Sequence, residues 1–295
     1  MPKKQKKKTS KLGLVVGTIP ESFELGDTRL MKPVCHQKYE NGLLQGSMLI
    51  QDIDEVSLNK KSRITYFVPN NVALSLSVSK KALINAKKMY IENFTNPEVV
   101  LDLDEMAGNR KEMMASASSL VCDYLENIQT SLVFAYTALE VFTNLSIPED
   151  YAYNAEKNSK GISETYDKQA IERWLPLKVK IKNILTDVYK TKKIEDKKWW
   201  GNFLNLEQYR NDIIHQKSIS HTEFYKDYFK QSIFNVCESP DHIIKFFHDS
   251  LSESKQTNPI WPWMEGAKSL PINSSYDSRQ FEVVGNMYEG IKKKL

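Results

Sequence analysis

The segment from Ser116 to Leu145 contains neither glycine nor proline. Its apolar side chains recur at steps of three and four positions, which is the spacing that places them on one face of an α-helix. These side chains are Leu120, Tyr124, Ile128, Leu132, Tyr136, Leu139 and Phe142. The segment therefore predicts one long helix that is ended by Pro148, and other elements must cover its apolar face.

Three more helical patterns follow this segment. The first runs from about Ser163 to Tyr189 and is kinked or divided at Pro176, because proline removes a backbone hydrogen bond. Its apolar stripe comprises Trp174, Leu177, Ile181, Ile184 and Val188. The second runs from Asp196 to about Lys217, and the third from Glu223 to about Leu251, with a break and a new helix cap at Ser239-Pro240-Asp241. Together the patterns predict a mainly α chain with an antiparallel helical bundle.

The residues before the bundle have a different pattern. Arg63–Val68 and Val72–Val78 flank the turn residues Pro69-Asn70-Asn71, which predicts a β-hairpin. Two further strands and a helix are expected at Leu12–Val16, Met48–Ile53 and Lys80–Phe94. We therefore expect a basic disordered arm at 1–11, a small α+β module at 12–112, the bundle at 113–253 and a C-terminal extension at 254–295. The module could recruit a partner, present substrate or gate the bundle, and the sequence does not choose among these roles.

The helical pattern from Asp196 to about Lys217 carries the residues that point most directly to chemistry. It ends with Leu206-Glu207-Gln208-Tyr209-Arg210-Asn211-Asp212-Ile213-Ile214-His215. The Arg210 guanidinium is permanently charged and can hold a phosphate, and the His215 imidazole can transfer a proton near neutral pH. These two groups can break an RNA phosphodiester without a metal ion. We predict attack of a 2′-hydroxyl on the adjacent phosphate, which leaves 2′,3′-cyclic phosphate and 5′-hydroxyl ends.

Helical spacing assigns a place to each residue of this motif. Glu207, Asn211 and His215 are four positions apart and lie along one stripe, and Arg210 lies at its margin. Asn211 is therefore expected to hydrogen-bond His215 and to orient its ring. If the helix frays at its end, Arg210 and His215 can turn toward a common point.

The bundle, the Arg-Asn-x-x-x-His element late in its third helix, and Glu140 inside an apolar run of the first helix resemble the HEPN superfamily. The resemblance covers roughly residues 113 to 253, and the family motif is an arginine followed four to six residues later by a histidine. It implies a metal-independent ribonuclease of a bacterial toxin–antitoxin or antiphage system. It also implies a homodimer in which two copies of the motif share one cleft, and an antitoxin or defence-system partner.

Other interpretations of the same residues stay open. Arg210 could only pair with Glu207 on the helix surface, and His215 could be an ordinary polar residue at a helix end. Glu140 could be buried with Arg210 as its partner, or exposed at the rim of the bundle. The alternative function is a catalytically silent, HEPN-like protein that binds RNA or another protein.

Several other groups are candidates for binding roles. Lys197, Lys198 and Lys217 are candidate RNA contacts, since lysines cluster around this connection and cations attract phosphates. Trp199-Trp200 could stack on bases, although paired aromatic residues at a helix start are more often core anchors. Asp102, Asp104 and Glu105 could bind a divalent ion, but a strand running into a helix cap explains them more simply. The remaining histidines have no metal-ligand spacing, and no phosphate-binding glycine loop occurs, so neither a metal nor a cofactor is expected.

Composition limits the class of protein. With 41% hydrophobic and 26% charged residues, the chain can bury a substantial core and still carry a charged surface. No apolar run is long enough to cross a membrane, and the lysine-rich start is not followed by the apolar core of a signal peptide. The three cysteines are far apart in the sequence, which favours a reducing compartment. We therefore expect a cytoplasmic protein.

Overall fold

The computed structural model describes residues 11–17, 26–96, 98–99, 101–155, 161, 163–216, 218, 222–253, 270–273, 281–286 and 290–291. These residues divide into two compact units. Unit 1 comprises the described parts of 1–73 and 251–295, and unit 2 comprises those of 74–250. Helices account for about 52% of the described residues, which agrees with the predicted mainly α class. No helix in the described ranges combines the length and the apolar character that a membrane span requires.

Unit 1 is built on one mixed β-sheet. Its strands are β1 (Lys11–Gly17), β2 (Val34–Glu40), β3 (Leu43–Ser57), β4 (Arg63–Phe67), β7 (Ile272–Asn273), β8 (Phe281–Asn286) and β9 (Gly290–Ile291). The strand order is β7-β2-β3-β1-β8-β9, and β4 pairs with β3. β1 and β8 run parallel, as do β2 and β7, whereas the other pairs are antiparallel. The C-terminal strands therefore complete a sheet that the N-terminal strands begin.

The β2–β3 hairpin is explained by its turn residues. Asn41 and Gly42 both have positive φ, 51° and 75°, and Glu40 pairs directly with Leu43. A two-residue turn of this kind matches the twist of its strands and favours the Asn-Gly sequence. The sheet buries Val16, Cys35, Leu49 and Leu270 in one cluster. The predicted strands at 12–16 and 48–53 are confirmed as parts of β1 and β3.

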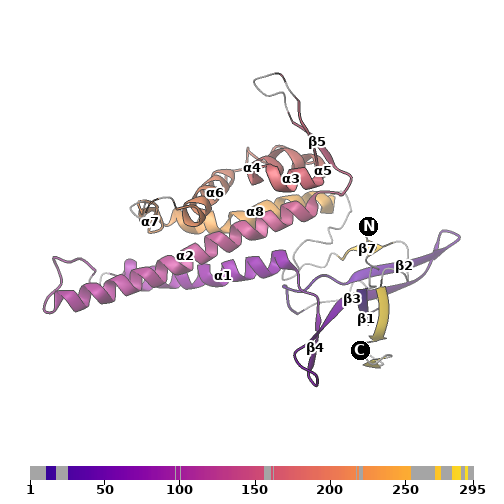
Figure 1. Ribbon diagram of the computed structural model, residues 1–295, viewed down its shortest axis with the longest axis horizontal. Coiled ribbons are helices and arrows are strands. Elements are labelled where there is room, and N and C mark those ends of the chain that lie inside the picture. Colours follow the sequence, from indigo (N-terminus) through magenta and orange to yellow (C-terminus); the bar gives the residue numbers. More distant parts are fainter. Residues whose placement is uncertain are drawn as a thin grey trace, which may run out of the picture. The chain divides into compact units, whose positions relative to one another are not determined.

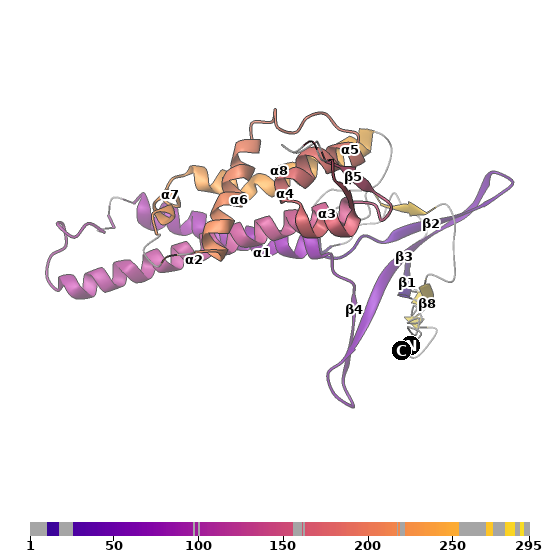
Figure 2. The ribbon, with the colours of Figure 1, turned by 45° about the horizontal axis from the view of Figure 1, so that its top comes forward.

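Unit 2 contains the helical bundle. The helices are α1 (Asn71–Met89, whose first residues lie in unit 1), η2 (Tyr90–Phe94), α2 (Arg110–Ser146), α3 (Lys168–Trp174), α4 (Leu177–Val179), η3 (Lys180–Leu185), α5 (Thr186–Val188), α6 (Trp200–Ile214), α7 (Phe224–Asp227) and α8 (Ser232–Glu253). A short hairpin, β5 (Ala152–Asn154) with β6 (Thr165–Asp167), precedes α3. Figures 1 and 2 show α2 lying beside α1, with α3, α4 and α6 on the other side of α2.

The long helix predicted from 116 to 145 is confirmed as part of α2. Asn109 caps its first turn by accepting a hydrogen bond from the Glu112 backbone N–H (3.4 Å), and the helix ends one residue before Ile147-Pro148. Its predicted stripe is buried except at Leu120, which is half-buried: Tyr124, Ile128, Leu132, Tyr136, Leu139 and Phe142 all lie in the core. The Ser79 hydroxyl on α1 bonds the Ser131 carbonyl on α2 at 3.0 Å, because small side chains let the two helices approach closely.

The predicted hairpin at 63–78 is wrong in its second half. Arg63–Phe67 is strand β4, but Val72–Val78 lies in α1. Asn70 caps this helix, since its side-chain oxygen accepts the Ala73 backbone N–H at 3.2 Å. The alternation of Leu and Ser in 74–77 resembled a strand, yet the buried positions that continue the pattern, at Leu76 and Leu83, follow helical spacing.

The predicted break at Ser239-Pro240-Asp241 is also wrong. Pro240 lies inside α8, which continues to Glu253. The carbonyl of Val236, which would have bonded a backbone N–H at position 240, accepts the Ser239 hydroxyl at 2.8 Å instead. Because this hydroxyl compensates the missing donor, the helix continues. Asp241 does not cap a new helix, and its carboxylate pairs with Lys80 at 3.0 Å.

The domain boundaries expected from the sequence differ from the observed units. The expected boundary at 112 separates Lys80–Phe94 from the bundle, but α1 from Leu74 onward belongs to unit 2. The expected C-terminal extension contributes β7, β8 and β9 to unit 1. Of the arm expected at 1–11, Lys11 instead starts β1 and pairs with Asp52 at 3.3 Å. Residues 1–10 and the segment from Pro259 to Trp263 lie outside the described residues.

Candidate active site

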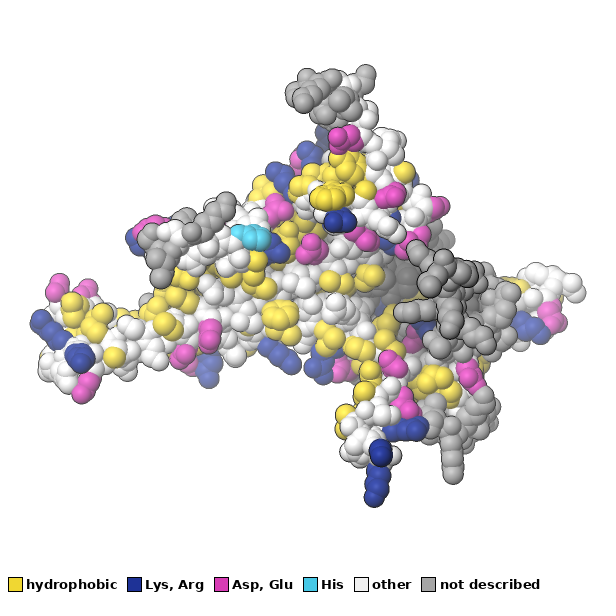
Figure 3. Space-filling view, viewed as in Figure 1, with side chains coloured by type: hydrophobic (Ala, Val, Ile, Leu, Met, Phe, Trp, Pro, Cys, Tyr) yellow, Lys and Arg dark blue, Asp and Glu magenta, His cyan; other side chains and the backbone are white. Residues whose placement is uncertain are grey.

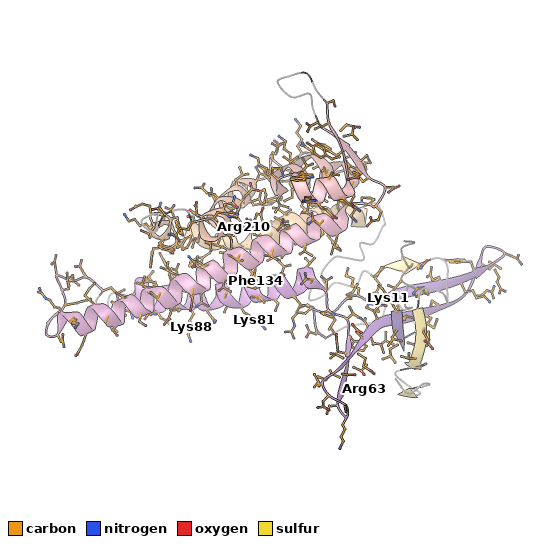
Figure 4. The ribbon with its side chains drawn as sticks, viewed as in Figure 1. Lys11, Arg63, Lys81, Lys88, Phe134 and Arg210 are labelled. Atoms are coloured by element: carbon orange, nitrogen blue, oxygen red, sulfur yellow. The ribbon has the colours of Figure 1, made fainter. Side chains whose placement is uncertain are left out.

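The motif residues lie at the C-terminal end of α6. His215 ends this helix: its backbone N–H donates to the Asn211 carbonyl at 2.9 Å, and its ψ of 31° leaves the helical region. The departure turns the His215 side chain back toward the last helical turn. Figure 4 labels Arg210 on the face of unit 2 that is turned to the viewer, and Figure 3 shows an exposed histidine on the same face.

Arg210 and His215 are brought into contact. The Arg210 Nη1 lies 3.4 Å from the His215 Nε2 and 3.0 Å from the Asn211 Oδ1. A guanidinium has donors and no acceptor, so Nε2 must be the unprotonated ring nitrogen in this contact. His215 and Asn211 are exposed and Arg210 is half-buried. The predicted hydrogen bond from Asn211 to His215 is replaced by one from Arg210 to Asn211, because the guanidinium lies between the two side chains.

The Arg210 guanidinium lies over an aromatic ring of α2. Its Cζ is 4.9 Å from the centroid of the Tyr136 ring, which attracts the cation through its electron-rich face. Tyr136 is only 7% exposed. Burial, with help from Glu207 and Glu140, raises the pKa of the Tyr136 hydroxyl, so this group stays neutral beneath the arginine. The ring thus fixes the arginine on α6 against α2.

Glu207 lies one turn before Arg210 and is half-buried. Burial raises the pKa of its carboxyl, and this effect is opposed by the Lys178 backbone N–H and by the charges of Lys178 and Arg210. Glu207 therefore connects the start of α4 with α6. Within the described residues, no ion pair joins Arg210 to Glu207 or to Glu140, so the pairing alternative for Arg210 is not observed.

Glu140 has a different electrostatic neighbour from the one expected. It is half-buried on α2, and its charge acts on Tyr136 and on Lys180. Lys180 is 2% exposed and donates to the Asn144 Oδ1 at 3.1 Å and to the Glu172 carbonyl at 3.0 Å. Burial lowers the pKa of Lys180 whereas Glu140 raises it. Glu140 is thus neither paired with Arg210 nor fully exposed, and its charge acts on the buried Lys180.

The lysines proposed as RNA contacts are not grouped around Arg210. Lys197 and Lys198 are exposed before the start of α6, and the Lys197 Nζ lies 5.2 Å from the Phe246 ring of α8. Arg210 lies near the other end of α6, a helix of 15 residues and hence roughly 22 Å long. Lys217 lies outside the described residues. Lys178, which was not among the predicted RNA contacts, is a cation whose charge acts on Glu207 of this helix.

Two other expectations are resolved by the structure. Trp200 is buried and its ring lies 4.9 Å from that of Phe203, so the interpretation of this residue as a core anchor is confirmed. Asp102 accepts the Asp104 backbone N–H at 2.9 Å within a turn, rather than at the end of a strand as expected. In the part of the chain that the structure describes, no group of three or more His, Cys, Asp or Glu side chains could hold a metal ion.

Comparison with known proteins does not place this geometry in a family: no family model, no curated protein and no solved structure matches the chain. The resemblance to the HEPN superfamily therefore stays a prediction, based on the Arg210 and His215 motif and its place in a helical bundle. The structural observations that bear on function are those of the site itself.

Replacing Glu207 with glutamine is expected to change how stability depends on pH. Burial raises the folded-state pKa of Glu207 above its ordinary 4.5, so the folded chain binds this proton more tightly than the unfolded chain. The stability contributed by this proton is present below about pH 4.5 and is lost as pH rises through the folded-state pKa. Glutamine suffers no such loss. The free energy of unfolding of Glu207→Gln, relative to the native chain, should rise between about pH 4 and about pH 7 in urea titrations.

Glu126→Gln is the matched control for the loss of one negative charge, since Glu126 is exposed on α2. For each variant, the free energy of unfolding relative to the native chain is followed as a function of pH. A difference for Glu207→Gln that is flat or falls with pH would mean that burial does not penalise this carboxylate.

Proposed function

We propose that this chain is a metal-independent endoribonuclease whose reacting groups are Arg210 and His215. The observation that carries the proposal is the contact between the Arg210 Nη1 and the His215 Nε2 at 3.4 Å, on an exposed helix end. A cation that holds phosphate and a base that accepts a proton are thus within reach of one phosphodiester. The HEPN-like motif supports the same assignment.

The geometry suggests a separate role for each of these groups in the reaction. Arg210 presents several N–H donors, of which Nη1 faces both Asn211 and His215. When a phosphate oxygen accepts the Nη1 hydrogen bond in place of His215, the Nε2 lone pair becomes free to accept a proton. The ring nitrogen then accepts the proton of the 2′-hydroxyl as its oxygen attacks phosphorus. The bond between phosphorus and the 5′ oxygen breaks, and the guanidinium stabilises the negative charge that develops on the phosphate oxygens.

The leaving 5′ oxygen also needs a proton. One imidazole that has just accepted a proton from the 2′-hydroxyl is not placed to deliver another on the opposite side of phosphorus in the same step. A second copy of the motif would supply this acid, which is the arrangement that the HEPN resemblance implies. We therefore propose that the active species is a homodimer, as part of a bacterial toxin or antiphage system with its own protein partner.

The proposal is tested by the ends that the enzyme leaves. Purified protein incubated with total RNA in excess EDTA should produce fragments with 5′-hydroxyl and 2′,3′-cyclic phosphate termini. EDTA is the control for metal-dependent contaminants, which leave different ends or stop. Fragments with 5′-phosphate ends, or cleavage that EDTA abolishes, would reject the proposed chemistry.

A further inference from the structure

Trp174, the last residue of α3, is unexpectedly exposed. The sequence placed it on the apolar stripe of its helical segment, but 65% of its surface is accessible. Of the stripe positions after Pro176, Leu177, Ile181 and Ile184 are buried and Val188 is half-buried. The expectation for Trp174 is therefore wrong.

The backbone explains this exposure. α3 buries Ile171 and ends at Trp174, and Leu175 adopts an extended conformation (φ −89°, ψ 135°) before Pro176. Residues that precede proline are pushed out of the helical region, so the helical phase is lost between Trp174 and Leu177. Leu177 then starts a new stripe that faces the core, and the indole is left outside it.

A cation lies on the exposed indole. The Arg173 Cζ is 4.7 Å from the centroid of the Trp174 ring, and the Arg173 side chain is itself exposed. The nearest acidic side chain in the sequence is Glu172, which lies 4.0 Å from the Lys168 Nζ. An exposed flat ring can stack on a base, and an adjacent guanidinium can contact the phosphates on either side of it. This combination suits single-stranded nucleic acid better than an apolar protein surface.

The exposed indole is linked to the candidate active site by the chain that follows it. Lys178 is four residues beyond Trp174, and its backbone N–H and charge stabilise the Glu207 carboxylate. Glu207 precedes Arg210 by one turn of α6. Both views in Figures 1 and 2 show α3, α4 and α6 side by side along α2. Four residues of chain span roughly 14 Å at most, so the Trp174 backbone lies within that distance of Lys178, whose backbone N–H bonds Glu207.

We propose that Trp174 and Arg173 form a stacking platform that holds one base of a single-stranded RNA next to Arg210 and His215. This inference rests on the proposed ribonuclease function, and it names the substrate as single-stranded. Bases in a duplex are already stacked on one another and do not present a free face to the indole, so a duplex does not use the platform. The platform reads no particular base, because every base has an aromatic face.

The test measures binding without cleavage. A fluorescently labelled single-stranded DNA of mixed sequence presents bases and phosphates but has no 2′-hydroxyl, so the proposed reaction cannot occur. Its affinity for the full chain is measured by anisotropy. Trp174→Ala should weaken binding between about 5- and 150-fold, which is the range for the loss of one stacked base. Trp174→Phe keeps an aromatic face and should recover most of this loss.

Two further measurements separate stacking from general effects. Ile91→Ala is the matched control, because Ile91 is as exposed as Trp174, at 66%, and lies elsewhere in unit 2; it should bind like the native chain. Arg173→Gln should reduce the slope of log affinity against log salt by about one, as expected for one lost phosphate contact.

Failure of the native chain to bind the single strand, or Trp174→Ala affinity within about twofold of the native value, overturns the platform. The platform is also overturned if Trp174→Ala and Ile91→Ala lose the same affinity for the single strand. It is likewise overturned if Trp174→Ala lowers the affinity for a DNA duplex as much as it lowers the affinity for the single strand. RNA cleavage is scored separately: a platform that binds DNA in a chain that does not cut RNA retains the inference and rejects the ribonuclease. A chain that cuts RNA but whose binding does not depend on Trp174 retains the ribonuclease and rejects the platform.

Discussion

His215→Ala is expected to lower the rate of RNA cleavage by about 10²- to 10⁴-fold, which corresponds to roughly 3 to 5 kcal/mol in the barrier. The reason is the loss of the proton acceptor that faces Arg210 at 3.4 Å. His215 is exposed at a helix end, so its removal should leave the fold intact. Initial rates on a single-stranded RNA, measured together with circular dichroism, check both statements.

The control for this prediction lies on the same helix. Gln208 is also exposed on α6, and Gln208→Ala should cleave RNA at the native rate. If His215→Ala retains native cleavage while folded, the imidazole is not the proton acceptor. The alternative of a catalytically silent binding protein would then be the better interpretation of the motif.

Arg210→Lys is expected to lower the cleavage rate by about 10²- to 10³-fold, the range measured for the loss of one preorganised donor to a developing oxyanion. Lysine keeps the positive charge but offers a compact point charge in place of a planar fork. It cannot hold a phosphate by two parallel bonds, and it does not stack on the Tyr136 ring, which lies 4.9 Å from the guanidinium carbon. The substitution thus separates geometry from charge.

Arg63→Lys, on β4 of unit 1, is a matched exchange at an exposed arginine that pairs with Glu55 at 3.2 Å. It should not change the cleavage rate. Arg210→Lys activity within about threefold of the native rate would show that a single positive charge is sufficient. Binding of the uncleavable single-stranded DNA by Arg210→Lys reports whether the loss lies in binding or in the chemical step. Losing a contact that forms only in the transition state lowers the rate of cleavage more than the affinity.

Elements with strong local signals were predicted well. The long helix in α2 follows from its periodicity and its lack of glycine and proline, and a single cap at Asn109 starts it. The β2–β3 hairpin has an equally local signal in Asn41-Gly42, which the sequence analysis missed. The two errors at 72–78 and at 239–241 have a different origin. In each, one side chain, Asn70 or Ser239, supplied a hydrogen bond that allowed the helix to form or to continue.

The candidate site was predicted in part. Arg210, Asn211 and His215 were identified by residue type and spacing, and the structure places all three in contact through the guanidinium. Tyr136 and Lys178 were not identified as site residues, because nothing in their local sequence distinguishes them from a core tyrosine and a surface lysine. Trp174 was assigned to the core, since its spacing from Leu177 fits a helix if the backbone at Pro176 is ignored.

By itself the sequence determined that the second half of this chain is helical, and which arginine and histidine lie near one helix end. Both depend on residues within a few positions of one another, through helix spacing, caps and chain breaks. Only the tertiary structure decided that the Arg210 guanidinium lies over Tyr136, that the charge of Glu140 acts on the buried Lys180, and that Trp174 is exposed. The physical reason is that burial and electrostatic surroundings depend on which distant segments pack together, and a local pattern does not specify that packing.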